Sequence, residues 1–274
     1  MFSPRLGCSS ISFRHLPLPE ALRTMRESGF REIDLGALPG VCDHVPYVLD
    51  EHAVDRVSTE VGTSGLAVRS VNGDIGDLNT PLDDEQRTAR EQHLEMLLRL
   101  TRAVGARALV LPCGASDHDP VRSLEEDLDT VAAELTHASD RAAVTGVEVW
   151  TESLHVHRLC WNIDRARRLT SRLAGTGVGV VMDFSHIVAS GGNPVDFIET
   201  FDERIAHVHL RDAIPGDINL GIGNGKADFA AGFHALAAAN YSGHFSLELE
   251  TRDVTDEERP AAAVAAAEFV SPLL

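Results

Sequence analysis

The sequence predicts a single-domain (β/α)₈ barrel, a TIM barrel spanning residues 1–274, and three observations lead to this fold class. Eight short apolar runs rich in β-branched residues alternate strictly with eight amphipathic stretches. The length of 274 residues and the hydrophobic content of 43% allow one large core, since barrels of this kind occupy about 250 residues. No linker or shift in composition divides the chain. An open doubly wound sheet shows the same alternation and is the alternative fold.

The eight apolar runs are expected to be parallel strands. Strands buried on both faces are continuously apolar, whereas half-exposed strands alternate between apolar and polar residues. In chain order the runs occupy residues 5–13, 31–37, 67–75, 106–114, 147–153, 178–186, 205–213 and 244–250.

The stretches between these runs are expected to be helices. Their apolar residues recur at three- and four-residue spacing, acidic residues stand near their starts, and glycine stands near many of their ends. They occupy residues 18–29, 51–65, 83–106, 120–146, 162–175, 193–201, 228–240 and 256–270. Each helix therefore follows a strand, which is the order of a closed barrel.

Charge and cysteine usage exclude several classes of protein. The chain has 42 acidic and 24 basic residues, and the net charge of −18 repels a phosphate backbone, so we expect no nucleic-acid partner. The cysteines are widely spaced and no secretory leader is recognisable, so we expect free thiols in a cytoplasmic protein. No apolar segment approaches the ~20 residues of a membrane-spanning helix, so we expect no membrane partner.

Four polar residues stand at the ends of four successive predicted strands, and these residues are Glu152, Asp183, His209 and Glu248. The carboxyl ends of barrel strands meet at one mouth. Carboxylates packed this closely raise one another's pKa values, and a bound cation relieves the repulsion. Any one of these residues alone could equally be a helix cap or part of a loop salt bridge rather than a metal ligand. Together they predict a metal centre whose oxygen and nitrogen donors suit Mn²⁺, with Mg²⁺, Co²⁺ or Zn²⁺ as alternatives.

The segments TESLH, VVMDFSH, AHVHLRD and GHFSLELE resemble the signature of the xylose-isomerase-like TIM-barrel superfamily. This superfamily includes sugar isomerases, ketose 3-epimerases, inosose dehydratases and endonuclease IV. The resemblance covers nearly the whole chain and is specific for fold and metal but not for substrate. Position by position, the same four residues match the family's metal ligands. His207 lies deeper in its strand and is expected to be a core histidine, and Glu250 is the alternative ligand if the strand register differs.

The resemblance also separates this chain from endonuclease IV, which builds a three-zinc site from additional histidines. Two of those histidines would fall at Asn72 and Cys113, and its Asp-x-His motif would fall on Asp217 and Asn219. Histidine is missing from three of these positions. Together with the net charge, this indicates a single-metal site and argues against DNA repair.

The resemblance implies carbon-acid chemistry. In the family's epimerases two ligand glutamates lie on opposite faces of the reacting carbon of a keto sugar, and Glu152 and Glu248 match them. One removes the α-proton and the other returns it, through a metal-stabilised enediolate. The leading prediction is a metal-dependent isomerase or epimerase of a keto sugar or cyclitol. The alternative is a lyase with the same first step, such as an inosose dehydratase or an eliminating deglycosylase of oxidised glycosides.

A third class, a catalytically inactive sugar-binding barrel, is disfavoured because all four ligand positions are intact. The predicted partner is therefore a small carbohydrate. Homo-oligomerisation is common in the family.

Several residues at the predicted mouth are candidates for binding the substrate. His186 matches a substrate-binding histidine of the family, with helix capping as the alternative. Arg211 stands where many family members have lysine, and it either holds a substrate anion or hydroxyl pair or forms a salt bridge with Asp212. His155 and His157 follow the fifth strand, and each faces either the substrate or the solvent.

Three further features near the mouth are weaker candidates. Asn72 and Asp74 follow the third strand and either bind hydroxyls or form an Asx-turn. Trp161 either stacks on a sugar or packs in the core. The glycine-rich segment 214–226 lacks the placement of a phosphate-binding loop, so we expect a βα-loop that covers the site and carries Lys226 toward an anionic group.

Overall fold

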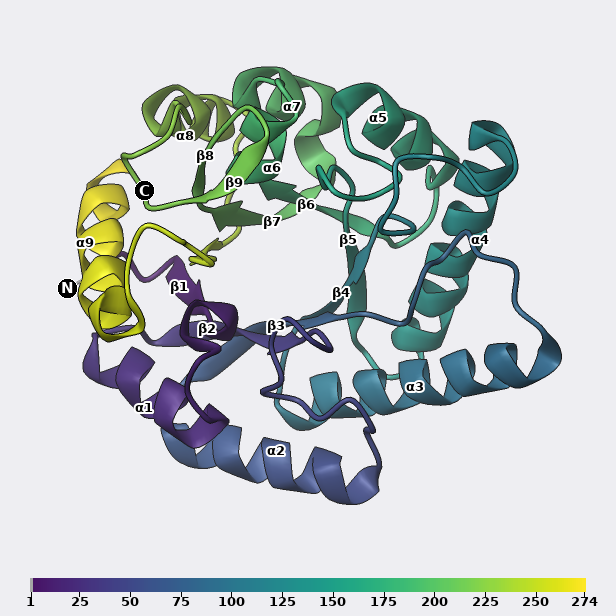
Figure 1. Cartoon of the computed structure of the whole chain (residues 1–274), viewed down its shortest axis with the longest axis horizontal. Coiled ribbons are helices and arrows are strands. Elements are labelled where there is room, and N and C mark those ends of the chain that lie inside the picture. The colour runs from purple at the N-terminus through teal and green to yellow at the C-terminus, as the bar shows by residue number, and fades with distance from the viewer. Residues whose placement is uncertain (1) are drawn as a thin grey trace.

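The computed structural model describes residues 2–274, and within them eight parallel strands close into a barrel surrounded by helices (Figure 1). The predicted TIM-barrel fold is confirmed. The strands are β1 (Leu6–Ser9), β2 (Glu32–Ala37), β3 (Ala67–Gly73), β4 (Ala108–Pro112), β5 (Glu148–Glu152), β6 (Gly179–Asp183), β7 (Ile205–Leu210) and β10 (Phe245–Leu247). They pair in chain order, and β1 closes the barrel by pairing with β10, with Leu6 opposite Phe245.

The helices begin at polar caps that the sequence supplies. Asp50, Ser123 and Asn162 each accept a backbone N–H with their side chains, and Asp83 forms a capping box with Gln86. Such caps satisfy N–H groups that have no partner within the helix. The helices are α1 (Leu18–Glu27), α2 (Glu51–Ser64), α3 (Asp84–Ala103), α4 (Leu124–Ala143), α5 (Ile163–Arg172), α6 (Phe184–Ala189), α7 (Pro194–Phe201), α8 (Phe229–Ala238) and α9 (Arg259–Val270).

The strands are shorter than the apolar runs that predicted them, and the sixth shows why. The run 178–186 continues past Asp183 to His186, yet β6 ends at Asp183 and α6 begins at the next residue. The Asp183 carboxylate accepts the backbone N–H groups of Ser185 and His186, so it ends the strand by capping the helix. This cap fixes the position of Asp183 at the mouth of the barrel.

A hairpin that the sequence did not predict follows the seventh barrel strand. It consists of the antiparallel strands β8 (Asp212–Ile214) and β9 (Asp217–Leu220). Asp212 holds the following glycine-rich loop, because its carboxylate accepts the backbone N–H groups of Gly223, Gly225 and Ala227 at 2.9–3.0 Å. The segment 214–226 is therefore partly a structured hairpin.

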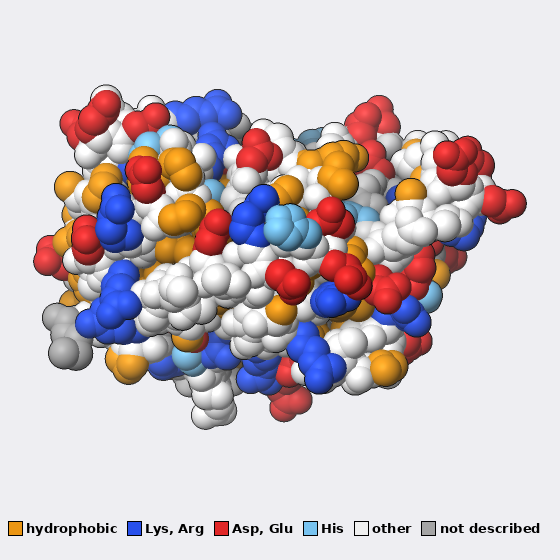
Figure 2. Space-filling view, turned by 90° about the horizontal axis from the view of Figure 1, so that it is seen from below, with side chains coloured by type: hydrophobic (Ala, Val, Ile, Leu, Met, Phe, Trp, Pro, Cys, Tyr) orange, Lys and Arg blue, Asp and Glu red, His pale blue; other side chains and the backbone are white. Residues whose placement is uncertain are grey.

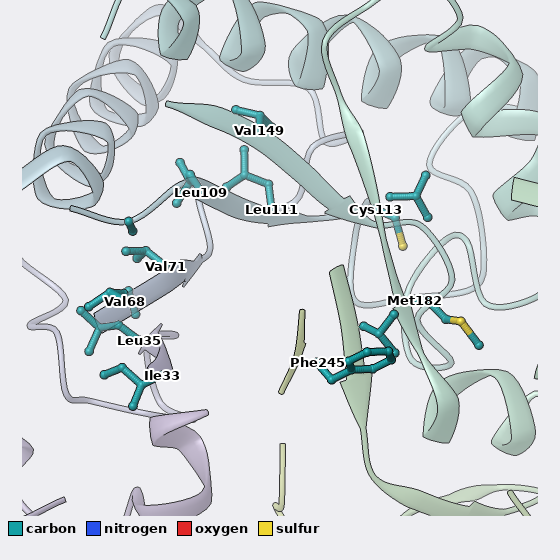
Figure 3. Close-up of a cluster of buried hydrophobic side chains, with 14 of the residues drawn as sticks. Ile33, Leu35, Val68, Val71, Leu109, Leu111, Cys113, Val149, Met182 and Phe245 are labelled. Atoms are coloured by element: carbon teal, nitrogen blue, oxygen red, sulfur yellow. The ribbon is translucent and has the colours of Figure 1, made fainter. Parts of the chain in front are cut away.

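The apolar core lies mainly between the barrel wall and the helices. Figure 3 shows strand side chains that belong to this core, among them Ile33, Val71, Leu109, Val149 and Met182. Because side chains alternate along a strand, the neighbouring residues point into the barrel. There a smaller apolar cluster forms around Trp150, and polar residues lie above and below it.

The outer surface carries many charged side chains of both signs. Acidic and basic side chains are interspersed over the side of the molecule drawn in Figure 2. In residues 2–274 no helix has the length and apolar character needed to cross a membrane.

Candidate metal centre and active-site pocket

The structure brings the four predicted metal ligands together at the carboxyl ends of their strands. Glu152 and Asp183 end β5 and β6, His209 lies next to the end of β7, and Glu248 follows β10 directly. Asp183 and His209 are paired across neighbouring strands. Each of the four offers a ligand atom, and these atoms all lie within 4.8 Å of one another. The spacing is that of side chains around one cation.

The cluster is buried, and the pKa values of its two glutamates shift in opposite directions. Burial raises the pKa of Glu152 well above its ordinary value, and the charges of Asp183 and Glu248 add to the effect. Burial also acts to raise the pKa of Glu248, but the positive charges of His209 and Arg211 outweigh it and the pKa falls. The two glutamates therefore differ in their tendency to hold a proton.

The donor set fits a divalent cation. Glu152 Oε1 and His209 Nδ1 are buried and have no hydrogen-bond partner among residues 2–274, although His209 Nδ1 lies 3.2 Å from Glu248 Oε2. A buried polar atom without a partner costs about 1–3 kcal/mol, so such atoms call for a bound ligand, water or ion. Three carboxylates and one imidazole suit Mn²⁺, Mg²⁺, Co²⁺ or Zn²⁺.

Arg211 lies inside the site and does not pair with Asp212, so the salt bridge considered from the sequence is not found. Its guanidinium is buried and donates to Ser185 Oγ at 3.0 Å and to Glu250 Oε2 at 2.7 Å. Its Nη2 lies 3.4 Å from Asp183 Oδ2. Arg211 therefore supplies a buried positive charge beside the carboxylates of the cluster.

Glu250, the alternative ligand in the sequence interpretation, belongs to this ion-pair network. Besides Arg211 it contacts Arg14, whose Nη1 lies 2.8 Å from Glu250 Oε1. Both carboxylate oxygens are thus used by guanidinium groups. This arrangement leaves Glu248 as the glutamate of that segment that faces the cation position.

His186 lies on α6 beside Glu152. Its Nδ1 accepts the backbone N–H of Val156 at 3.2 Å, so the neutral ring carries its proton on Nε2, 3.5 Å from Glu152 Oε1. Burial lowers the pKa of His186 well below its usual value, and the charge of Arg211 lowers it further. His155 packs against this ring with the centroids 3.8 Å apart, and burial followed by the charge of His186 lowers its pKa well below normal.

Glu152, His155 and His186 also have the spacing of a three-ligand metal group. However, this group shares Glu152 with the four-residue cluster and offers only one carboxylate against three. In addition, His186 Nδ1 already accepts the backbone N–H of Val156. The geometry therefore favours one cation, at the four-residue cluster.

The remaining candidates fall into two groups. Asn72 faces the site and donates from Nδ2 to Glu248 Oε1 at 3.2 Å. Asp74 is held in an ion pair with Arg158 at 2.8 Å. Trp161 stacks on His118 with the ring centroids 5.1 Å apart, away from the side chains that line the cavity in the described chain.

Two exposed candidate residues, His157 and Lys226, also differ in whether they line the cavity. His157 lines the rim of the cavity, whereas Lys226 is exposed and does not contribute to the lining within residues 2–274. The β8–β9 hairpin, which precedes the loop with Lys226, contributes Ile218 and Asn219 to the cavity lining. The segment 214–226 therefore reaches the site through its hairpin.

The cluster opens into a cavity of about 380 Å³. Cavities of about 300–1,000 Å³ are usual for small-molecule sites. Polar side chains line the cavity, among them Glu152, Glu248, Asn72, His186 and Arg211. Apolar side chains, which together form the apolar wall, complete the lining, and these are Ile11, Leu38, Pro39, Val41, Val110, Leu111, Pro112 and Ile218.

Asp34 is a buried residue of this region that the sequence interpretation missed. It lies on β2 beneath the cluster and accepts hydrogen bonds from Ser70 Oγ and His207 Nε2, both at 2.8 Å. His207 is thus a buried core histidine, as expected. An aspartate between Ile33 and Leu35, in the middle of the predicted strand 31–37, was the available signal, because buried charges are rare unless they are paired.

The fold and the cluster together define a TIM-barrel protein with a candidate metal centre at the catalytic end of the barrel. The chain belongs to the xylose isomerase-like TIM barrel family, whose model matches residues 22–273.

Similar sequences include a rhizopine catabolism protein and an inosose dehydratase. The chain is 28% identical over 261 residues to the rhizopine catabolism protein MocC of Rhizobium meliloti, covering 85% of this chain and 75% of the relative. It is 26% identical over 147 residues to an inosose dehydratase of Clostridium botulinum, covering 46% of this chain and 48% of the relative.

Similar solved structures confirm the fold at low sequence identity. The 3-keto-D-glucoside 4-epimerase YcjR from E. coli has a TM-score of 0.76 at 22% identity, over 96% of this chain and 99% of that chain. The IolI protein with a bound zinc atom has a TM-score of 0.80 at 20% identity, over 98% of this chain and 99% of that chain.

Proposed function

We propose that the protein is a divalent-metal-dependent isomerase or epimerase that removes the proton next to the carbonyl of a keto sugar or cyclitol. One observation carries the proposal: Glu152 and Glu248 lie at one cation-sized cluster, and their environments shift their pKa values in opposite directions. A pair of carboxyl groups with separated pKa values is what an acid and a base at one site require. The metal is proposed to be Mn²⁺, with Mg²⁺, Co²⁺ and Zn²⁺ as alternatives.

Each residue has a role that follows from its contacts. Glu152, Asp183, His209 and Glu248 would hold the ion, which when bound polarises the substrate carbonyl and acidifies the adjacent C–H. Glu248 is the base that accepts the α-proton, and Asn72 fixes the orientation of its carboxylate. Glu152 returns a proton from the other side. Arg211 and His186 also line the cavity, and their polar groups would orient the substrate hydroxyls.

The substrate class is supported by the size of the cavity and by the relatives. About 380 Å³ is suitable for a single sugar or cyclitol ring, and the apolar wall suits its C–H face. A structural neighbour acts on a keto-glucoside. A cytoplasmic location and the oligomeric state stay predictions.

A lyase is the second candidate, and the match to inosose dehydratases favours it. Abstraction of the same proton followed by loss of a β-hydroxyl gives elimination of water. The two reactions differ in product mass, because isomerisation conserves the substrate mass and dehydration lowers it by one water.

The proposal is tested by proton exchange with solvent. Metal-free protein is reconstituted separately with Mn²⁺, Mg²⁺, Co²⁺ and Zn²⁺ and incubated in D₂O with a panel of keto sugars and inososes. We expect deuterium to enter one substrate carbon in the metal-loaded samples and in none of the metal-free ones. Exchange that is equal with and without metal would contradict the proposal, and mass spectrometry of the product separates the two reaction classes.

A further inference from the structure

Two histidines of β7 share one buried carboxylate beneath the candidate metal centre. Asp34 Oδ2 lies 2.8 Å from His207 Nε2 and 3.4 Å from His209 Nε2. The other oxygen, Oδ1, accepts the Ser70 hydroxyl at 2.8 Å. Asp34, Ser70, His207 and His209 are each at most 1% exposed. The carboxylate is therefore anchored by Ser70 and His207 independently of His209.

The two nitrogens of His209 face different environments. Nδ1 lies 3.2 Å from Glu248 Oε2, on the side of the ligand cluster, and Nε2 faces Asp34. A histidine that binds a metal through one nitrogen keeps its proton on the other. A carboxylate facing Nε2 favours the proton there, which leaves the lone pair of Nδ1 directed at the cluster. At 3.4 Å the contact is longer than a full hydrogen bond, so Asp34 acts on the ring mainly through charge.

We propose that Asp34 is a positioning residue that holds His209 with Nε2–H toward β2 and Nδ1 toward the cation, and this inference rests on the metal centre of the proposed function. His207 and Ser70 hold Asp34 in place. Second-sphere carboxylates of this kind orient ligand imidazoles and raise their basicity. The role also explains why an aspartate and a histidine are buried side by side below the site.

Asp34, His207 and His209 also have the spacing of a metal group. The short contact between Asp34 and His207 is that of a hydrogen bond, and the Trp150 ring lies over His207 with the centroids 5.5 Å apart. We therefore treat the three as a hydrogen-bonded support. A variant of His207 separates the two interpretations, because a ligand and a support respond differently to its loss.

The first test measures the affinity of the full chain for Mn²⁺ alone, by calorimetry. Asp34→Asn keeps the size of the side chain and removes its charge, and we expect the affinity to fall about 10- to 100-fold. The matched control is His207→Gln, which retains a donor toward Asp34, and we expect its affinity to change less than about threefold. An Asp34→Asn variant that binds Mn²⁺ as tightly as the wild type would overturn the proposal, as would a His207→Gln variant that loses binding.

Failure of this inference is distinguishable from failure of the proposed function. If the wild type does not bind Mn²⁺, the metal centre itself is wrong. If the wild type binds and Asp34→Asn binds equally well, only the role of Asp34 is wrong. A merely structural Asp34 would lower the melting temperature of the metal-free protein without weakening Mn²⁺ binding at a temperature where the variant is folded.

A second measurement uses the wild type alone and stands even if Asp34→Asn does not fold. In zinc-loaded protein with ¹⁵N-labelled histidine, two-bond ¹H–¹⁵N spectra report which ring nitrogen is protonated. We expect His209 to carry its proton on Nε2 and to bind zinc through Nδ1. A proton on Nδ1 would overturn the proposal.

Discussion

The two ends of the barrel carry similar numbers of charged strand residues but neutralise them differently. At the amino end, Glu32 lies 2.6 Å from His244 and 3.5 Å from Arg69, and Glu148 lies 2.9 Å from Arg107. At the carboxyl end, three carboxylates and a histidine converge. The amino end thus gives each carboxylate its own partner, whereas the carboxyl end concentrates negative charge.

Burial sharpens the difference. Arg107 and Glu148 are 60% and 44% exposed, and exposed pairs contribute about 0–1 kcal/mol. Asp183 and His209 are at most 1% exposed, and Glu152 Oε1 has no hydrogen-bond partner within the described chain. A sequence retains so costly a cluster where function requires it. The size of a cavity does not identify the functional end of the barrel, because the cavity at the amino end is larger, at about 900 Å³.

The largest expected effect compares glutamates at the two ends of the same strand. Glu152→Gln and Glu248→Gln remove the acid and the base, and we expect α-proton exchange to fall by about 10²- to 10⁴-fold. Glu148→Gln is the matched control, since Glu148 begins β5 and Glu152 ends it. NMR in D₂O measures the exchange. Equal losses in Glu148→Gln and Glu152→Gln would remove the functional distinction between the two ends.

The next comparison concerns two arginines. Arg211→Met leaves Asp183 and Glu250 without their buried partner, and we expect the free energy of unfolding to fall by about 3–5 kcal/mol. Arg107→Met breaks an exposed pair and should cost less than about 1 kcal/mol. Urea unfolding of the two metal-free variants measures both values. Similar losses would mean that the carboxyl end is no more strongly coupled than the amino end.

Metal should stabilise the protein through the carboxyl end alone. At a Mn²⁺ concentration of about 100 times the dissociation constant we expect a gain of about 2.7 kcal/mol, seen as a higher melting temperature that a chelator reverses. His209→Ala should abolish the gain, and His244→Ala at the amino end should keep it. A gain that persists in His209→Ala would place the ion elsewhere.

The smallest effect concerns a histidine behind the carboxyl mouth that is outside the ligand cluster. Burial lowers the pKa of His44 below 6.5, against a partly opposing hydrogen bond to Leu16. The neutral form is thus favoured in the folded protein, and the associated stability is present above about pH 6.5 and lost as the pH falls through the folded pKa. His44→Gln should reduce the difference in urea midpoint between pH 7.5 and pH 5. An unchanged difference would contradict this assignment.

The sequence predicted the features that depend on local pattern. Continuous apolar runs located all eight barrel strands, since burial on both faces requires them. Four polar residues stand at strand ends, and this alone predicted that they meet at one mouth of the barrel. They are Glu152, Asp183, His209 and Glu248. The end of the sixth strand at Asp183 was predicted, but the short helix α6 was not, because Asp183 serves both as the last strand residue and as the helix cap.

Contacts between distant strands were not predictable in this way. Asp34 is held by Ser70 and His207, and Arg211 pairs with Glu250. These contacts join residues far apart in the sequence, and no local pattern encodes them. For Trp161 the sequence left two roles open, stacking on a sugar or packing in the core. In the structure its ring stacks on His118.

The buried cluster at the carboxyl end is proposed to hold one cation. Crystals grown with Mn²⁺ would show the position of the ion by anomalous diffraction. We expect one strong anomalous peak between Glu152, Asp183, His209 and Glu248, with His209 Nδ1 as the nitrogen ligand. A crystal with Mn²⁺ present and no peak at this cluster, or with its main peak at Asp34 and His207, would contradict it.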